Sequence, residues 1–122
     1  TKKGGFKTWQ EEQIAAYEAA HPLGTPARLA FDLALYTAQR RSDVCVMGPQ
    51  HVAHGKITVK QLKTGKTLRI PLHPHLSASI TATPTGHLAF IVSNRGAPRT
   101  KESFGNWFAE QCATAGLKGY SM

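Results

Sequence analysis

The spacing of apolar residues changes partway along this chain, and this change constrains the fold more than any other feature. In TPARLAFDLALYT, residues 25–37, apolar side chains recur at helical spacing. In HGKITVKQLKTGKTLRIPLH, residues 54–73, apolar and polar residues alternate, and KTGK interrupts the alternation. The sequence therefore predicts an amphipathic helix that ends near Arg40, followed by a β-hairpin that turns near Gly65.

Capping residues predict further helix boundaries. In TWQEEQIAAYEAA, Thr8 can cap the first turn, and Glu11 can complete a capping box with it. Thr25, followed by proline, is the corresponding cap of the helix over residues 25–37. TKESFGNWFAEQCATAGL is typical of a helix that begins after Thr100 and is ended by Gly116.

Two shorter segments lie between the hairpin and the last helix. PHLSASITA, residues 74–82, is interpreted as a short helix, and LAFIV, residues 88–92, as a short strand. In the last helix, Trp107 and Phe108 recur beside another aromatic residue and are more typical of a core than of base stacking. The expected fold class is α+β, mainly helical with a small antiparallel β-sheet, in one domain over residues 1–122.

The charge of the chain favours polyanionic partners. Its 15 Lys and Arg residues against 7 Asp and Glu give a formal net charge of +8 and a pI near 9.9. Such a surface attracts nucleic acid first. No stretch approaches the roughly 20 apolar residues of a membrane span, and no signal-peptide pattern opens the chain. We therefore expect a cytoplasmic protein that associates with DNA and not with a membrane.

Cysteine and histidine give no indication of a metal or disulfide site. Cys45 and Cys112 lie far apart and outside any C-x-x-C pattern, so both are expected to be small buried residues. The histidines form two close pairs, His51 with His54 and His73 with His75. No carboxylate or thiolate cluster accompanies them, and metal coordination is not expected.

Three motifs follow one another along the chain: YTAQRRSD, KTGKTLRIPLH and GAPRTKESFGNWFAEQCATAGL. In this order they resemble the catalytic domain of the tyrosine recombinases, also called phage-type integrases. YTAQRRSD resembles that family's T-G-x-R-x-x-E/D box, with Arg40 at the catalytic arginine and Asp43 at the acidic position. KTGKTLRIPLH resembles its β-hairpin, with Lys63 at the lysine of the turn. The resemblance extends over nearly the whole chain from Phe6 onward.

The resemblance implies site-specific DNA recombination by the full-length protein. In the family a tyrosine attacks a DNA phosphodiester, forms a 3′-phosphotyrosine and releases a 5′-hydroxyl, and no cofactor is needed. Arg40 is then expected to bind the non-bridging phosphate oxygens, and Lys63 to protonate the leaving 5′-oxygen, with Lys66 as the alternative acid. Asp43 either orients Arg40 or is a first-turn residue after a Ser42 cap.

Two departures from the family pattern stand out. Ala38 occupies the position of the box's glycine, which is tolerable if the backbone there is helical. The sequence also ends before the family's H-x-x-R box and nucleophilic tyrosine, and none of Tyr17, Tyr36 and Tyr120 corresponds to that tyrosine. The expectation is a partial catalytic domain, inactive alone, that works in a homo-oligomer on double-stranded DNA.

Basic residues outside the catalytic positions are expected to contact phosphates without reading sequence. The candidates are Lys60, Lys66 and Arg99, together with Lys2, Lys3, Arg69, Arg95 and Lys101. Arg41 is either a backbone contact of this kind or a surface residue at a helix end. Two alternatives remain, a non-catalytic basic DNA-binding module and a basic RNA-binding domain. The residues that follow in the full-length protein distinguish the first, and an RNA competition assay distinguishes the second.

Overall fold

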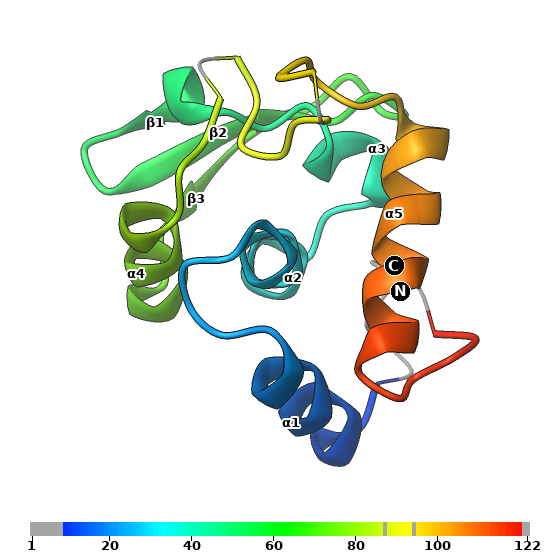
Figure 1. Ribbon diagram of the computed structural model, residues 1–122. Helices are drawn as coiled ribbons and strands as arrows, with labels where there is room; N and C mark the ends of the chain where they lie inside the picture. Colours follow the sequence, from blue (N-terminus) through cyan, green and yellow to red (C-terminus); the bar gives the residue numbers. More distant parts are fainter. Residues whose placement is uncertain (1–8, 87, 94, 121–122) are drawn as a thin grey trace.

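The helix α2 (Pro26–Thr37) lies at the centre of the structure, a computed structural model that describes residues 9–86, 88–93 and 95–120. Figure 1 shows α1, α4 and α5 around α2, with a small sheet beyond it. The order along the chain is α1 (Glu11–Ala20), α2 (Pro26–Thr37), α3 (Arg41–Val44), the 3-10 turn η1 (Pro49–His51), β1 (Val52–Ala53), β2 (Lys56–Lys60), β3 (Thr67–Pro71), α4 (Pro74–Ala82) and α5 (Lys101–Thr114). This agrees with the expected mainly helical α+β fold.

The core forms on α2 because its small and branched side chains are buried along most of its length. Leu29, Leu33 and Phe31 are fully buried, and each such side chain contributes about 1.5–3 kcal/mol through its burial. Tyr17 of α1 stacks on Phe31 with ring centroids 4.6 Å apart, and its hydroxyl donates to the Ala27 carbonyl at 2.7 Å. The central helix is thereby held in place by neighbours on several sides.

The two ends of α2 differ in how well the sequence predicted them. Thr25 caps the start as expected, accepting from the backbone N–H of Arg28 at 3.2 Å. The expected end near Arg40 is wrong, because α2 ends at Thr37. Ala38 has φ 56° and ψ 32°, which is left-handed and not helical. The condition under which Ala38 would be tolerable in the box, a helical backbone, is therefore not met, and this position favours glycine.

The predicted hairpin is confirmed, and β1 extends it to a three-stranded antiparallel sheet of order β1-β2-β3. Ile57 pairs with Ile70, and Val59 pairs with Leu68. Ile57 and Val59 are buried, so the alternation in the sequence corresponds to an inner and an outer face. Two backbone hydrogen bonds close the turn over residues 61–66. Gln61 N–H donates to the Lys66 carbonyl, and Gly65 N–H donates to the Gln61 carbonyl, each at 2.8 Å.

The outer helices begin and end at local signals. Thr100 caps α5 by accepting from Ser103 N–H at 3.0 Å, and Gly116 ends it with φ +81°, both as predicted. Thr8 lies outside the described residues. The N-cap residue of α1 is Gln10, two residues beyond the expected Thr8, and Gln10 N–H donates to the Gln13 side chain at 2.7 Å. Glu11 is instead the first residue of α1.

Between α4 and α5 the prediction is only half right. The helix over residues 74–82 is confirmed as α4, but residues 88–92 do not form a strand. Phe90 N–H donates to the Met47 carbonyl at 2.8 Å, and Val92 makes a single bridge with Pro98. Ala89, Phe90 and Ile91 are buried, so the apolar run records burial in an irregular segment.

Candidate functional site

Arg40 is the N-cap residue of the short helix α3 and does not end α2. Its carbonyl accepts from the backbone N–H groups of Asp43 and Val44, each at 2.9 Å, and its side chain is exposed. The last turn of α2 contains no basic residue, so complementing the dipole of α2 does not explain this arginine. A cation at the N-terminal end of a helix opposes the helix dipole and is unfavourable for that helix. Local helix energetics therefore leave Arg40 free for another role.

Asp43 is directed toward the hairpin. Its side chain is buried, and Oδ1 accepts from the backbone N–H of Leu62 at 2.9 Å. Among the described residues, the ion pairs join Arg28 to Glu18 and to Asp32, and none joins Asp43 to Arg40. The expected role of Asp43 in orienting Arg40 stays a prediction. The alternative Ser42 cap is wrong, because Arg40 is the N-cap residue of α3.

A second bond links the hairpin to the segment before Arg40, and sequence reasoning missed it. Gln61 Nε2 donates to Gln39 Oε1 at 2.8 Å, and the buried Gln39 donates from Nε2 to the Thr37 carbonyl at 3.0 Å. Gln61 follows Ile57 and Val59 at the next inward-facing position, directly after the strand. A polar residue at that position was the sequence feature that could have indicated a buried hydrogen-bond partner. The two links attach the lysine-bearing turn to the chain on either side of Arg40.

The turn itself presents two lysines. Lys63 and Lys66 are both exposed. The residue before Lys63, Leu62, donates to Asp43, and the residue after it, Thr64, donates to Gln61. A cleft of about 390 Å³ opens between the hairpin and residues 46–51. Its lining includes Asp43, Met47, His51, Val59, Lys60 and Leu62. The turn is therefore held at its base and borders an open cleft.

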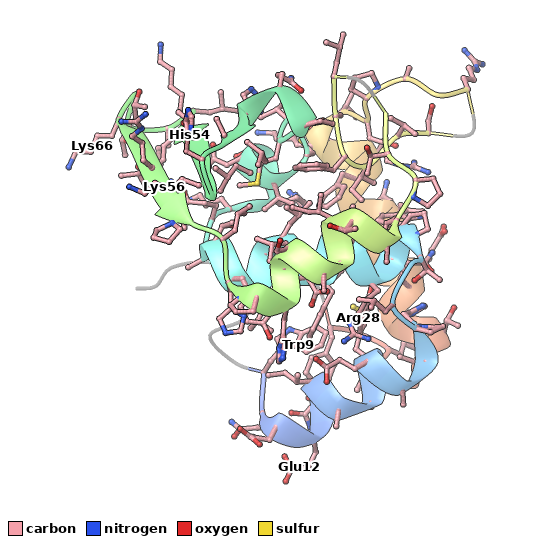
Figure 2. The ribbon with its side chains drawn as sticks, turned by 90° about the vertical axis from the view of Figure 1, so that its left-hand side faces the viewer. Trp9, Glu12, Arg28, His54, Lys56 and Lys66 are labelled. Carbon is pink, nitrogen blue, oxygen red and sulfur yellow. The ribbon has the colours of Figure 1, made fainter. Side chains whose placement is uncertain are left out.

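The outer face of the sheet is basic. Lys56, Lys60 and Arg69 are exposed on it, and Arg69 pairs with Thr58 across β2 and β3. The sequence contains no Asp or Glu between Val44 and Lys101. In Figure 2 the labelled Lys56 and Lys66 lie at one end of the molecule and Glu12 at the opposite end. The expected phosphate contacts Lys60 and Arg69 thus belong to one surface with Lys56, which we call the hairpin face, and Lys66 is exposed on the neighbouring turn.

Of the other expected contacts, Arg41 and Arg99 lie against α5, Arg95 and Lys101 are exposed, and Lys2 and Lys3 lie outside the described residues. A Cβ added at Gly105 would be 2.5 Å from Nη1 of Arg41, so the arginine side chain crosses the helix where it has no side chain. Arg99 donates from Nη1 to the Ser103 hydroxyl at 2.9 Å, and its Cζ lies 5.3 Å from the ring centroid of Trp107. Packing on α5 gives these two guanidinium groups defined positions.

Tyrosines and cysteines of the core are not activated. Burial raises the pKa of Tyr17 and of Tyr36, and it raises the pKa of Cys112 to about 12 and that of Cys45 above its usual range. Both cysteines are buried as predicted. Each of these groups is protonated near neutral pH, whereas a nucleophile needs its deprotonated form or an adjacent base. These side chains therefore serve as core residues.

The histidines take structural positions. His51 Nδ1 accepts from Gly48 N–H at 3.1 Å, and His73 Nδ1 caps α4 by accepting from His75 N–H at 3.1 Å. Within residues 9–86, 88–93 and 95–120, no three His, Cys, Asp or Glu side chains gather in a way that could hold a metal ion. Over the same residues, no helix combines the length and the apolar character that crossing a membrane requires.

Comparison with known proteins agrees with this geometry. The integrase of Escherichia phage lambda is 30% identical over 116 residues, which cover 88% of this chain and 33% of that protein. The integrase of Escherichia phage HK022 is 44% identical over 61 residues, which cover 50% of this chain and 17% of that protein. The chain thus spans a third or less of the length of these relatives.

Solved structures share the fold. A lambda integrase (75–356) dimer bound to a COC' core site superimposes with a TM-score of 0.71 at 27% identity, over 91% of this chain and 44% of that one. XerA recombinase, at 16% identity, shares the fold with a TM-score of 0.73, over 91% of this chain and 44% of that one. The profile of the phage integrase family matches residues 6–121. The chain therefore belongs to the phage integrase family.

Proposed function

We propose that this chain forms the first part of the catalytic domain of a tyrosine-type site-specific recombinase and contributes Arg40 and Lys63 to DNA cleavage and rejoining. The observation that carries the proposal is the double attachment of the lysine-bearing turn to the Arg40 segment. Asp43 binds Leu62, and Gln39 binds Gln61, one link on each side of Arg40. This double attachment supports the proposal because it ties together the two elements that bear the candidate cations, and catalysis on a phosphodiester requires such cations at one site.

The two cations have different tasks in this proposal. Arg40 is permanently charged and donates parallel hydrogen bonds to the non-bridging oxygens, where negative charge grows during attack. Lys63 carries a proton that it transfers to the leaving 5′-oxygen. Asp43 holds the turn through Leu62, so its effect on Lys63 is indirect. In this proposal none of Tyr17, Tyr36 and Tyr120 is the attacking tyrosine.

The proposed partner is double-stranded DNA, bound by copies of the protein acting together. Support comes from the lambda integrase structure, in which a dimer of that protein is bound to a core site, and from the charge of +8 on this chain. The phosphate backbone would be contacted by Lys60 on the hairpin face, by Lys66 on the turn, and by Arg41 and Arg99, which pack against α5. These contacts position the duplex and do not read its sequence.

Chemical rescue tests the two catalytic assignments in an active recombinase that carries this chain. Arg40→Ala should slow cleavage and rejoining by on the order of 100-fold or more, as for the loss of one preorganised donor. Lys63→Ala should slow cleavage of ordinary DNA. It should be rescued by a substrate with a 5′-bridging phosphorothiolate, because a thiolate leaves without a proton. Arg40→Ala should gain much less from the sulfur.

Lys66→Ala is the matched control, since Lys66 is an exposed lysine on the same turn. With DNA in excess it should cleave both substrates at rates near those of the unaltered protein, because loss of one phosphate contact weakens binding and leaves the chemical step unchanged. If sulfur rescues Lys66→Ala and not Lys63→Ala, the acid is Lys66. If Lys63→Ala and Lys66→Ala are both slow and the sulfur substrate rescues neither, the hairpin supplies no general acid.

A further inference from the structure

A continuous chain of hydrogen bonds joins the end of α2 to the lysine-bearing turn. The Thr37 carbonyl accepts from Gln39 Nε2 at 3.0 Å, and Gln39 Oε1 accepts from Gln61 Nε2 at 2.8 Å. Gln61 Oε1 then accepts from the Thr64 hydroxyl at 2.7 Å, and Thr64 Oγ1 accepts from Lys66 N–H at 3.1 Å. We call the side chains of Gln39, Gln61 and Thr64 the glutamine relay.

The direction of every bond in the glutamine relay is set by its two ends. A backbone carbonyl can only accept, so Gln39 must turn its amide nitrogen toward Thr37 and its oxygen toward Gln61. Gln61 must then present its nitrogen to Gln39 and its oxygen to Thr64. At the other end, Lys66 N–H can only donate. One arrangement alone satisfies all members, and a network of this kind fixes side-chain orientation.

From this geometry we infer that Gln39 and Gln61 are positioning residues for Lys63, which set where the turn lies relative to Arg40. The inference rests on the proposed function of Arg40 and Lys63. Gln39 is the residue directly before Arg40, and Gln61 and Thr64 bracket Lys63. The Gln61–Thr64 bond spans the lysine, so the backbone of the turn is held while the exposed lysine side chain stays free to reach a substrate.

Burial makes the glutamine relay more than a surface contact. Gln39 is 7% exposed, so removing its partner leaves a buried amide oxygen without a hydrogen bond. The Asp43–Leu62 bond holds the base of the turn independently. Loss of the glutamine relay should therefore leave the hairpin folded but let residues 63–66 move, and a misplacement of about 1 Å can cost on the order of 100-fold in rate.

The first experiment measures the glutamine relay itself in this chain. Gln61→Met keeps the length of the side chain and removes its donor and acceptor. Amide hydrogen exchange at Lys66 should speed up by on the order of 10-fold, because Thr64 loses its anchor, while exchange in α2 stays unchanged. Gln50→Met is the matched control, since Gln50 borders the same cleft but donates to the Leu88 carbonyl at 2.9 Å. Unchanged exchange at Lys66 in Gln61→Met would overturn the glutamine relay, whether or not the proposed function is correct.

The second experiment measures positioning in an active recombinase that carries this chain. Gln39→Met and Gln61→Met should each slow cleavage of ordinary DNA by on the order of 10-fold, and the double variant should be no slower than either. On 5′-bridging phosphorothiolate DNA these defects should largely disappear, as for Lys63→Ala. A purely structural defect would persist on both substrates.

Different failures have different meanings. If exchange at Lys66 rises but both glutamine variants cleave normally while Lys63→Ala does not, the positioning role is wrong and the proposed function stands. If the sulfur substrate rescues Lys63→Ala and leaves the glutamine variants slow, the glutamines act on something other than the acid. If Arg40→Ala and Lys63→Ala both cleave normally, the proposed function fails and the positioning role fails with it.

Discussion

At the scale of single residues, Ala38 shows a conformation that its side chain disfavours. Its φ of 56° places it in the left-handed region, where a Cβ costs roughly 1–2 kcal/mol. Its backbone N–H still donates to the Ala34 carbonyl at 3.0 Å, which ends α2 and turns the chain toward Arg40. The glycine typical of the recombinase box therefore has a backbone reason, and Ala38 retains the turn at a cost in stability.

Ala38→Gly should stabilise the chain by about 1 kcal/mol, since glycine removes the left-handed penalty and loses part of the gain to its own flexibility. Urea unfolding of the two proteins measures this difference. Ala15→Gly is the control, because Ala15 is exposed inside α1 and glycine there should destabilise by about 1 kcal/mol. A destabilised Ala38→Gly would contradict the assigned backbone conformation.

Asp32 is a buried carboxyl on α2 whose ionised form is poorly supported. Burial is the largest cause of its raised pKa, while the nearby Ser79 hydroxyl and the Arg28 guanidinium oppose that shift. Arg28 Nε lies 3.4 Å from Oδ2, but within the described part of the chain neither carboxylate oxygen has a partner in hydrogen-bond geometry. The folded state therefore binds a proton more tightly at Asp32 than the unfolded chain does.

This raised pKa predicts how stability changes with pH. The contribution of Asp32 is fully present below the unfolded carboxyl pKa of about 3.9 and is lost as pH rises through the higher folded value. Asp32→Asn should remove this decline. The difference in the free energy of unfolding, variant minus unaltered protein, should therefore increase between pH 4 and neutral pH. Ser79→Ala should steepen the decline, because it removes a group that lowers the pKa. Parallel curves for Asp32→Asn and the unaltered protein would contradict this account.

At the scale of elements, α5 packs against an arginine side chain that belongs to α3. Gly105 is buried inside α5, and the side chain of Arg41 from α3 crosses it. Glycine inside a helix costs about 1 kcal/mol relative to alanine, so the helix by itself does not favour it. The missing Cβ is what lets α3 and its arginine approach α5.

Gly105→Ala should leave the free energy of unfolding unchanged or raise it, because better helix propensity offsets a shift of the flexible arginine. It should weaken binding of this chain to duplex DNA by about as much as Arg41→Ala, as measured by fluorescence anisotropy. In an Arg41→Ala background, Gly105→Ala should cause no further loss of affinity. Additive losses would mean that Gly105 affects binding by a route other than Arg41.

At the scale of the whole molecule, charge is unevenly distributed. The hairpin face and the turn are basic, and the chain between Val44 and Lys101 carries no acidic residue. Binding to duplex DNA by this surface alone should be weak and should fall steeply with salt, because it depends on counterion release.

Lys60→Gln and Lys66→Gln should each reduce the slope of log affinity against log salt by about 1, since each removes one phosphate contact. Lys118→Gln is the control, because Lys118 is exposed beyond the end of α5 and should leave the slope unchanged. Titrations of labelled duplex at several salt concentrations measure the slopes. Tighter binding to RNA than to DNA in competition would favour the RNA-binding alternative.

The sequence by itself determined the features whose causes are local. Thr25 and Thr100 cap their helices because a hydroxyl reaches N–H groups only a few residues away, and Gly116 ends α5 for an equally local reason. The hairpin was predictable because alternation and its interruption lie within one short segment. The order of the three motifs indicated the family for the same reason, since motif order needs no knowledge of contacts.

Only the tertiary structure decided the contacts between distant segments. Asp43 binds Leu62, 19 positions away, and Gln39 binds Gln61, 22 positions away, and no local pattern specifies either partner. Phe90 N–H likewise donates to the distant Met47 carbonyl, so an apolar run that resembled a strand is a buried irregular segment. In each case a polar group is satisfied across the core, and the partner is set by how α2, α3 and the hairpin pack together.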